Sequence, residues 1–254
     1  MKEKMPSLFV SHGNPMAALD DKNEKEYRTW GEQLPKPGAI LVFSAHWEEE
    51  NLVFGETINH DQLVYDFYGF PEPLYQLQYP APGAPWLKDQ ISELLGQDIP
   101  QQQRGLDHGV WVPLRHIWPE ADIPILQMSL PSSYSNEQPL ELGKHLAPLR
   151  EQGIMIIGAG TLTHNLREGL SGKYITPPNW VTDFNDWVAN ALLNNPEELL
   201  NWEQTPYAKM NHPTKEHFRP LLITVGASSM EDNIIFPITG YDMQVFSKLS
   251  VQVG

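Results

Sequence analysis

The chain has 254 residues, of which 41% are hydrophobic and 19% are charged, a balance that is typical of a globular protein and not of a disordered chain. Its 32 acidic residues outnumber the 17 basic ones, and the formal charge of -15 argues against nucleic acid as a partner. Because the sequence contains no cysteine, disulfides, thiolate ligands and a cysteine nucleophile are excluded, and any metal must be bound by histidine, carboxylate or carbonyl groups.

Apolar runs and helical patterns alternate along the chain. The segments predicted to be strands are 7–11, 39–45, 51–58, 123–130, 154–160 and 246–254. The segments with apolar residues at helical spacing are 24–34, 84–96, 139–153 and 179–193. This order predicts an α/β fold, in which a central, largely parallel sheet is flanked by helices within a single layered domain over residues 1–254.

The segment 65–85, "YDFYGFPEPLYQLQYPAPGAP", is rich in aromatic residues and proline and is predicted to be a long shaped loop. Long ordered loops in compact domains are often binding loops or lids. No apolar stretch is long enough for a signal peptide or a membrane span, so the expected location is the cytoplasm, with no membrane partner.

Three histidines follow predicted strands, and two more lie in loop-like segments. His12 comes directly after the first strand, His46 after the second, and His164 a few residues after the strand at 154–160. His108 lies in "LDHGVW" and His217 in "NHPTKEHFRP". Because ligands of an open α/β sheet sit beyond the carboxyl ends of its strands, these side chains are expected to converge there. Neutral imidazole is the commonest metal ligand in proteins, so the pattern favours a metal site with open positions for a substrate.

The remaining histidines are interpreted as surface residues or hydrogen-bonded core residues; they are His60, His116, His145 and His212. The sequence contains no HExxH motif, no GxSxG motif and no phosphate-binding glycine loop. The histidines are therefore the main candidates for catalytic chemistry.

Six segments run in order along the chain: "LFVSHGNPM", "VFSAHW", "YDFYGFPEPLYQLQYPAPGAP", "LDHGVWVPLRHIWPEADIPILQMSL", "TLTHNL" and "PTKEHFRPLL". Together they resemble the class III extradiol ring-cleavage dioxygenases, specifically the 4,5-DOPA dioxygenase-like branch of the LigB superfamily, over nearly the whole chain. The resemblance implies an enzyme that inserts both atoms of O2 into a DOPA-like, catechol-type ring beside its hydroxyl pair and opens the ring.

The resemblance also implies a set of metal ligands. The histidines of "SHGNP", "SAHW" and "TKEHFRP" match the ligands of this branch, which gives His12, His46 and His217. Other members of the superfamily use a glutamate as the third ligand, so Glu216 is an alternative to His217. The implied ion is a single divalent metal, either Fe(II) for activity or Zn(II) as bound, because imidazole ligands suit both.

Further roles follow from the same resemblance. The histidine of "TLTHNL" matches the family's active-site base, so His164 is expected to take a proton from the catechol and also to touch the metal. The histidine of "DHG", His108, matches a group near substrate and oxygen. Aromatic residues of the loop are expected to wall the pocket; they are Phe67, Tyr68, Phe70 and Tyr75. Tyr65 stands where relatives have a histidine, which changes the expected substrate contacts.

Two alternatives stay open at this point. The protein could bind zinc and act as a hydrolase, or it could be a non-enzymatic binding module of the same fold. The sequence does not give the oligomeric state or the physiological catechol.

Overall fold

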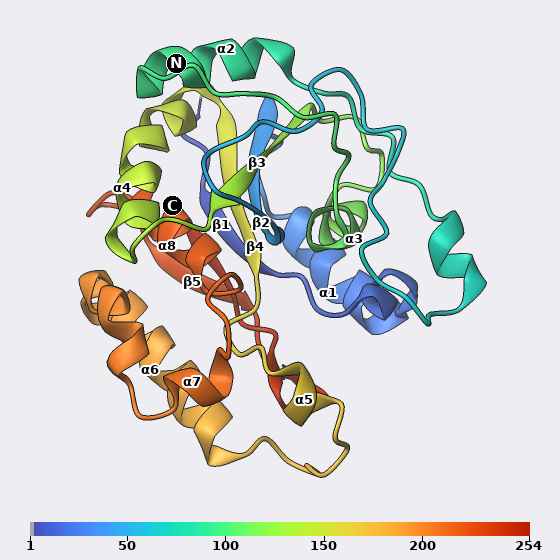
Figure 1. The fold of residues 1–254 in the computed structure, drawn as a ribbon, viewed down its shortest axis with the longest axis vertical. Helices are drawn as coiled ribbons and strands as arrows, with labels where there is room; N and C mark the ends of the chain where they lie inside the picture. The colour runs from blue at the N-terminus through green and yellow to red at the C-terminus, as the bar shows by residue number, and fades with distance from the viewer. Residues whose placement is uncertain (1–2) are drawn as a thin grey trace.

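The computed structural model describes residues 3–254 and shows a central sheet with helices on both faces (Figure 1). The sheet has six strands in the order β3-β2-β4-β1-β8-β5. Its strands are β1 (Ser7–Ser11), β2 (Ala39–Glu49), β3 (Ile125–Pro131), β4 (Ile154–Gly160), β5 (Ile234–Ile238) and β8 (Ser250–Val253). The first four are parallel to one another, whereas β8 is antiparallel to β1 and β5 is antiparallel to β8. The predicted α/β fold with a largely parallel sheet is confirmed.

The helices connect these strands. The α-helices are α1 (Asp21–Gly31), α2 (Pro85–Leu95), α3 (His108–Ile117), α4 (Glu137–Leu146), α5 (Leu166–Gly169), α6 (Asn179–Asn194), α7 (Ala208–Asn211) and α8 (Arg219–Gly226). The 3-10 helices are η1 (Pro15–Leu19), η2 (Glu72–Gln76), η3 (Ala147–Gln152) and η4 (Pro196–Gln204). A separate ribbon pairs β6 (Tyr241–Asp242) with β7 (Phe246–Ser247). Over residues 3–254, none of the helices combines the length and hydrophobicity that a membrane span needs.

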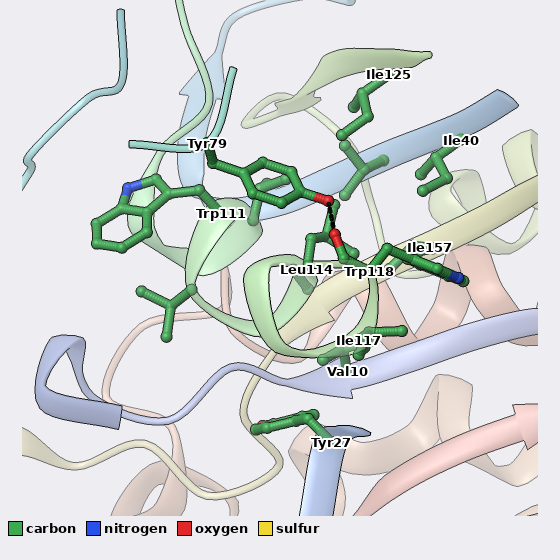
Figure 2. Packing of buried hydrophobic residues seen from close by; sticks show 14 of the residues in the cluster. Val10, Tyr27, Ile40, Tyr79, Trp111, Leu114, Ile117, Trp118, Ile125 and Ile157 are labelled. Atoms are coloured by element: carbon green, nitrogen blue, oxygen red, sulfur yellow. Dashed lines mark hydrogen bonds between the residues drawn. The ribbon is translucent and has the colours of Figure 1, made fainter. Parts of the chain in front are cut away.

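Both faces of the sheet are buried, which explains why its parallel strands are continuous apolar runs. Along β2, Ile40 and Val42 belong to the core cluster under α1 and α3, while Leu41 and Phe43 belong to the cluster under α2 and α4. The first cluster packs α3 against the sheet; Trp111, Leu114 and Ile117 of this helix belong to it together with Val10, Ile40 and Ile157 of the strands, and Figure 2 draws them. The Tyr79 hydroxyl donates to the Trp118 carbonyl oxygen at 3.0 Å, so this buried phenol is satisfied.

Three predicted elements are corrected by the structure. The segment 51–58 is not a strand, because its backbone groups bond to different segments in turn and only isolated bridges form at Phe54. The helix predicted over 139–153 ends as an α-helix at Leu146 and continues as the 3-10 helix η3, since Pro148 has no backbone N–H to donate. The strand predicted over 246–254 is divided into β7 and β8.

Candidate active site

The five histidines expected at the carboxyl edge of the sheet do converge. His12 Nε2 lies 3.3 Å from His46 Nε2, and the ring centroids of His46 and His217 are 5.0 Å apart. The His108 ring lies 4.0 Å from that of His46, and the His164 ring stacks on His217 with centroids 3.4 Å apart. Residues that span more than 200 positions of sequence therefore share one site.

His12 is held by the end of β1 and a tight turn. Its backbone N–H donates to the Gly160 carbonyl oxygen at the end of β4, 3.1 Å away. Its Nδ1 lies 2.7 Å from the Gly13 carbonyl oxygen and donates to it, which leaves Nε2 to face the other rings. Gly13 has a φ of +69°, in the left-handed region that glycine adopts without strain.

His46 lies inside β2 and not after it, in a part of the strand where regular pairing is interrupted. Pairing of β2 with β4 ends at Ser44, and the register of β2 with β3 shifts between Phe43 and Glu48. Such irregularities redirect side chains next to active sites. Gly109 in α3 permits the close approach, because a Cβ atom there would lie 2.9 Å from His46 Cδ2.

His217 completes a group of three imidazoles. His12, His46 and His217 each offer a ligand atom, and these atoms all lie within 4.8 Å of one another. The Nδ1 of His217 donates to Glu216 Oε1 at 3.0 Å, and its buried Nε2 has no hydrogen-bond partner within residues 3–254. Three ring nitrogens that converge in this way, one of them buried without a partner, fit a metal ion. Glu216 is oriented to position the His217 ring.

His164 follows β4 in a loop whose backbone is anchored, since its N–H donates to the Asn211 carbonyl oxygen at 2.8 Å. Burial, together with the smaller effect of the neighbouring histidines, lowers the pKa of His164 to about 3. The ring is therefore neutral at pH 7. His164, Glu216 and His217 form a second group of residues that could hold a metal ion.

Asp66 is a site residue that the sequence prediction missed. Its Oδ1 accepts hydrogen bonds from the backbone N–H and the Nδ1 of His108, at 3.1 and 2.9 Å. Its Oδ2 lies 3.2 Å from His46 Nδ1. Burial alone would raise the pKa of Asp66, but the hydrogen bonds from His108 and His46 hold it well below its usual range. One carboxylate thus fixes two of the five rings. His108 itself is the first residue of α3, not a loop residue.

A buried polar network lies behind these rings and holds the backbone on both sides of His46. The Asp107 carboxylate is fully buried and accepts from Ser44 Oγ at 2.7 Å and from Gln127 Nε2 at 2.6 Å. The backbone N–H of His46 donates to Ser44 Oγ. The backbone carbonyl oxygen of His46 accepts a hydrogen bond from the Arg104 guanidinium at 3.0 Å. The site is therefore rigidly supported before any ligand binds.

Four of the five rings, those of His12, His46, His108 and His164, line a pocket of about 590 Å³. Three predicted aromatic residues line it, namely Phe67, Tyr68 and Phe70. Tyr75 packs against Phe67, with centroids 5.2 Å apart, and supports this wall from outside the lining. Tyr65 is likewise outside the lining, because its hydroxyl donates to the Leu77 carbonyl oxygen at 2.6 Å.

The other four histidines each form one hydrogen bond with a backbone carbonyl group, as expected, while the Nδ1 atoms of His60 and His212 are buried without a partner within residues 3–254. His60 bonds to Ile125, His116 to Ala17, His145 to Glu141 and His212 to Leu162, at distances between 2.7 and 3.0 Å. None of the four lines the pocket.

The sequence from residue 6 to residue 247 matches the family described as the catalytic LigB subunit of aromatic ring-opening dioxygenase. The chain belongs to the LigB family. It is 38% identical to a protein of Escherichia coli K12 named 4,5-DOPA dioxygenase extradiol, over 99% of this chain and 95% of that one. A protein of the same name from Beta vulgaris is 40% identical, over 87% of this chain and 86% of the relative. The crystal structure of an uncharacterized Escherichia coli K12 protein matches with a TM-score of 0.85 and 34% identity, covering 98% of this chain and 100% of that one.

These similarities extend over the whole fold and not over a short motif. The chain is accordingly a ring-opening dioxygenase, and dioxygenases of this family use a metal. The cluster of histidines at the sheet edge supplies groups that can bind one.

Proposed function

We propose that this LigB enzyme opens the ring of a DOPA-like catechol by extradiol cleavage, with a single Fe(II) ion held by His12, His46 and His217. The observation that supports the proposal most strongly is the three-imidazole group, in which His12 and His46 line a pocket of about 590 Å³ and His217 has a buried Nε2 without a partner. A catechol ring is small enough to enter such a space. The relatives named 4,5-DOPA dioxygenase extradiol support the substrate class and the position of cleavage.

The donor set suits the ion. Three neutral imidazoles bind Fe(II) and leave open positions for a substrate. A bound Fe(II) would supply adjacent coordination positions for catechol and O2 and a path for electrons between them. His164 would add a further contact to the ion, because its ring stacks on the ring of His217, one of the proposed ligands.

Proton transfer is assigned to His164. A catechol must lose protons to bind a metal with both oxygens, and a neutral imidazole at the pocket can accept one. In the proposed role His164 takes a proton from a catechol hydroxyl and passes it on to solvent, because its low pKa disfavours a lasting imidazolium.

His108 is proposed to contact the reacting groups with its Nε2. Its Nδ1 is occupied by Asp66 at 2.9 Å, which leaves Nε2 as the nitrogen available to substrate and oxygen. A proton taken up there would form an imidazolium stabilised by the Asp66 carboxylate, and this charge would stabilise negative charge on the reacting oxygens. The aromatic wall of Phe67, Tyr68 and Phe70 would exclude water from this chemistry.

A second candidate function rests on the same donor set. Three imidazoles also bind Zn(II), which ranks above Fe(II) in affinity for such ligands. A zinc-loaded protein of this fold would act as a hydrolase or as a binding module, and we expect zinc to occupy the site without supporting ring opening. We further propose that the enzyme acts in the cytoplasm.

The test is the loading of the purified protein with Fe(II) without oxygen, followed by the addition of DOPA, caffeate or protocatechuate and air. The expected result is a visible absorbance from the conjugated semialdehyde product, which the zinc-loaded protein does not give. His145→Gln, a surface histidine outside the site, is the matched control and should keep full activity. Bound Fe(II) without product or oxygen uptake from any catechol would favour the hydrolase or binding-module alternative.

A further inference from the structure

The loop that carries His164 is bonded to the segment that leads to His217. This loop, residues 161–165, follows β4 directly. The backbone N–H of His164 donates to the Asn211 carbonyl oxygen at 2.8 Å, and the backbone N–H of Thr161 donates to the His217 carbonyl oxygen at 3.2 Å. The stacking of the two imidazole rings, with centroids 3.4 Å apart, therefore depends on how these two segments are held against each other.

His212 joins the same two segments through its side chain. Its ring is buried, and its Nε2 lies 2.7 Å from the carbonyl oxygen of Leu162, two residues before His164. Burial lowers the pKa of His212 to about 4, so the ring is neutral at pH 7 and carries one hydrogen on its nitrogen atoms. Because a carbonyl oxygen can only accept, this hydrogen is on Nε2, which donates to Leu162.

Packing alone does not explain a histidine at position 212. The ring contacts three aromatic side chains, those of Phe184, Trp202 and Phe218, with centroids 5.3 to 5.6 Å away. Its Nδ1 is buried and has no hydrogen-bond partner in the part of the chain that the structure describes, which is unfavourable. A phenylalanine ring would pack among these side chains without that cost. The histidine supplies what phenylalanine lacks, the N–H that donates to Leu162.

We propose that His212 is a positioning residue for His164, and that its Nε2–H holds the loop 161–165 so that the His164 ring is aligned to take a proton from the catechol. The inference rests on the ring-opening function and on the role of His164 proposed above. His164 lines the pocket and His212 does not, so His212 acts through the loop and not by contact with the substrate. Without this hydrogen bond the buried Leu162 carbonyl oxygen would lose its donor and the loop would be less firmly held. A displacement of about 1 Å at a reacting group can lower a rate by about 100-fold.

Two substitutions at His212 separate the hydrogen bond from the packing. His212→Phe keeps a ring of similar size and removes the donor, whereas His212→Gln can place an amide N–H near the position of Nε2. In the Fe(II)-loaded protein we expect His212→Phe to retain its iron and a KM for DOPA within about threefold of the unaltered value, while kcat falls about 10- to 100-fold. His212→Gln should recover most of kcat. A loss confined to kcat that an amide reverses indicates misalignment and not a general loosening of the core.

Hydrogen–deuterium exchange measures the same contact without turnover. In the Fe(II)-loaded protein without oxygen, we expect the backbone amides of 161–165 to exchange at least about tenfold faster in His212→Phe, because exchange follows local opening. His60→Phe is the matched control. His60 is also buried, its Nε2 lies 3.0 Å from the Ile125 carbonyl oxygen, and its Nδ1 likewise has no partner among the described residues. This control should lower the free energy of unfolding by a similar amount and leave kcat and the exchange of 161–165 unchanged.

Three results would overturn the positioning role. One is an unchanged kcat per bound iron in His212→Phe together with unchanged exchange of 161–165. The second is an equal loss of kcat in His60→Phe, and the third is a loss of iron from His212→Phe as complete as in His12→Ala.

If His212→Phe does not fold, His212→Asn replaces it, because the shorter amide does not reach the Leu162 carbonyl oxygen. Its kcat should fall by the same factor, and equal kcat values in the asparagine and glutamine variants would overturn the role. A failure of the unaltered Fe(II)-loaded protein to open any catechol would instead contradict the proposed function itself. The exchange comparison would still test the contact of His212 with the loop, so the two failures are distinguishable.

Discussion

The carboxylate of Asp66 provides a sharp test of how the site is organised, because it contacts both a proposed ligand and a proposed catalytic group. Asp66→Asn keeps the size and shape of the side chain and removes its charge. The amide has one carbonyl oxygen, so it can accept from His108 or from His46 but not from both in the present geometry. One of the two rings would lose the partner that fixes its orientation.

The size of the effect follows from the contacts that are lost. A hydrogen bond to a charged group contributes about 1.5–3 kcal/mol, and loss of a group that orients a metal ligand typically costs about 10- to 100-fold in metal affinity or activity. If the amide oxygen of Asp66→Asn stays with His108, His46 loses its partner and we expect Fe(II) affinity to fall about tenfold, because two ligands remain fully held. If it stays with His46, His108 loses its partner and we expect kcat per bound iron to fall about 10- to 100-fold.

The assay is a titration with Fe(II) against a competing chelator without oxygen, followed by rate measurements normalised to bound iron. Asp61→Asn is the matched control, since Asp61 is an exposed aspartate shortly before Asp66 in the sequence. This variant should have the iron affinity and turnover of the unaltered protein. Wild-type iron affinity together with wild-type turnover in Asp66→Asn would refute the bridging role.

Three other changes have distinct expected outcomes. Replacement of any one proposed ligand by alanine, at His12, His46 or His217, should empty the site, as mass spectrometry after dialysis can show; one retained metal per chain would remove that residue from the ligand set. His164→Gln should keep most of its iron and still bind catechol while turnover falls about 100- to 10,000-fold, whereas a loss of metal as complete as in His12→Ala would make His164 a ligand first. Asp232→Asn should lower the free energy of unfolding by about 2 kcal/mol at pH 7, measured by urea unfolding, and by less as the pH falls.

The effect at Asp232 has a defined direction with pH. Burial would raise its pKa, but hydrogen bonds from Lys4 and Arg150 lower it to about 2. Since the folded-state value is lower than the ordinary value of about 4, the stabilisation is complete above pH 4 and is lost as the pH falls through 4 toward 2. Asp122→Asn is the control, because its ion pair with Lys36 is exposed and should contribute less than about 1 kcal/mol. A difference between the Asp232 variant and the unaltered protein that stays constant down to pH 2 would contradict this assignment.

The strands predicted best are those that are buried at every residue along their length. The strands β1 and β4 have the predicted bounds, because strands that are buried on both faces form uninterrupted apolar runs. The helix α2 ends as predicted at Gly96, which adopts a φ of +63°. By contrast, α8 is buried on all sides and has no polar face, so its sequence carries no helical period to detect.

The histidine cluster was predictable because strand ends converge, but its supports were not. The segment "LDHGVW" predicts a loop-like position for His108, yet α3 begins at this residue and packs against the sheet. Asp66 contacts His108 across 42 residues of sequence, and no local pattern specifies a contact between a loop and a helix start. The role of Tyr65 also depends on the loop's own packing, since its hydroxyl bonds to Leu77 within the same loop.

The central claim is that this site joins O2 to a catechol and opens the ring. The most direct measurement is the stoichiometry of the Fe(II)-loaded protein in an oxygen electrode, with the product identified by mass spectrometry. The expected result is one O2 consumed per catechol, no released peroxide, and a product whose mass equals that of the catechol plus one O2 molecule. Oxygen uptake that yields peroxide and quinone, with the ring intact and iron bound, would contradict the account.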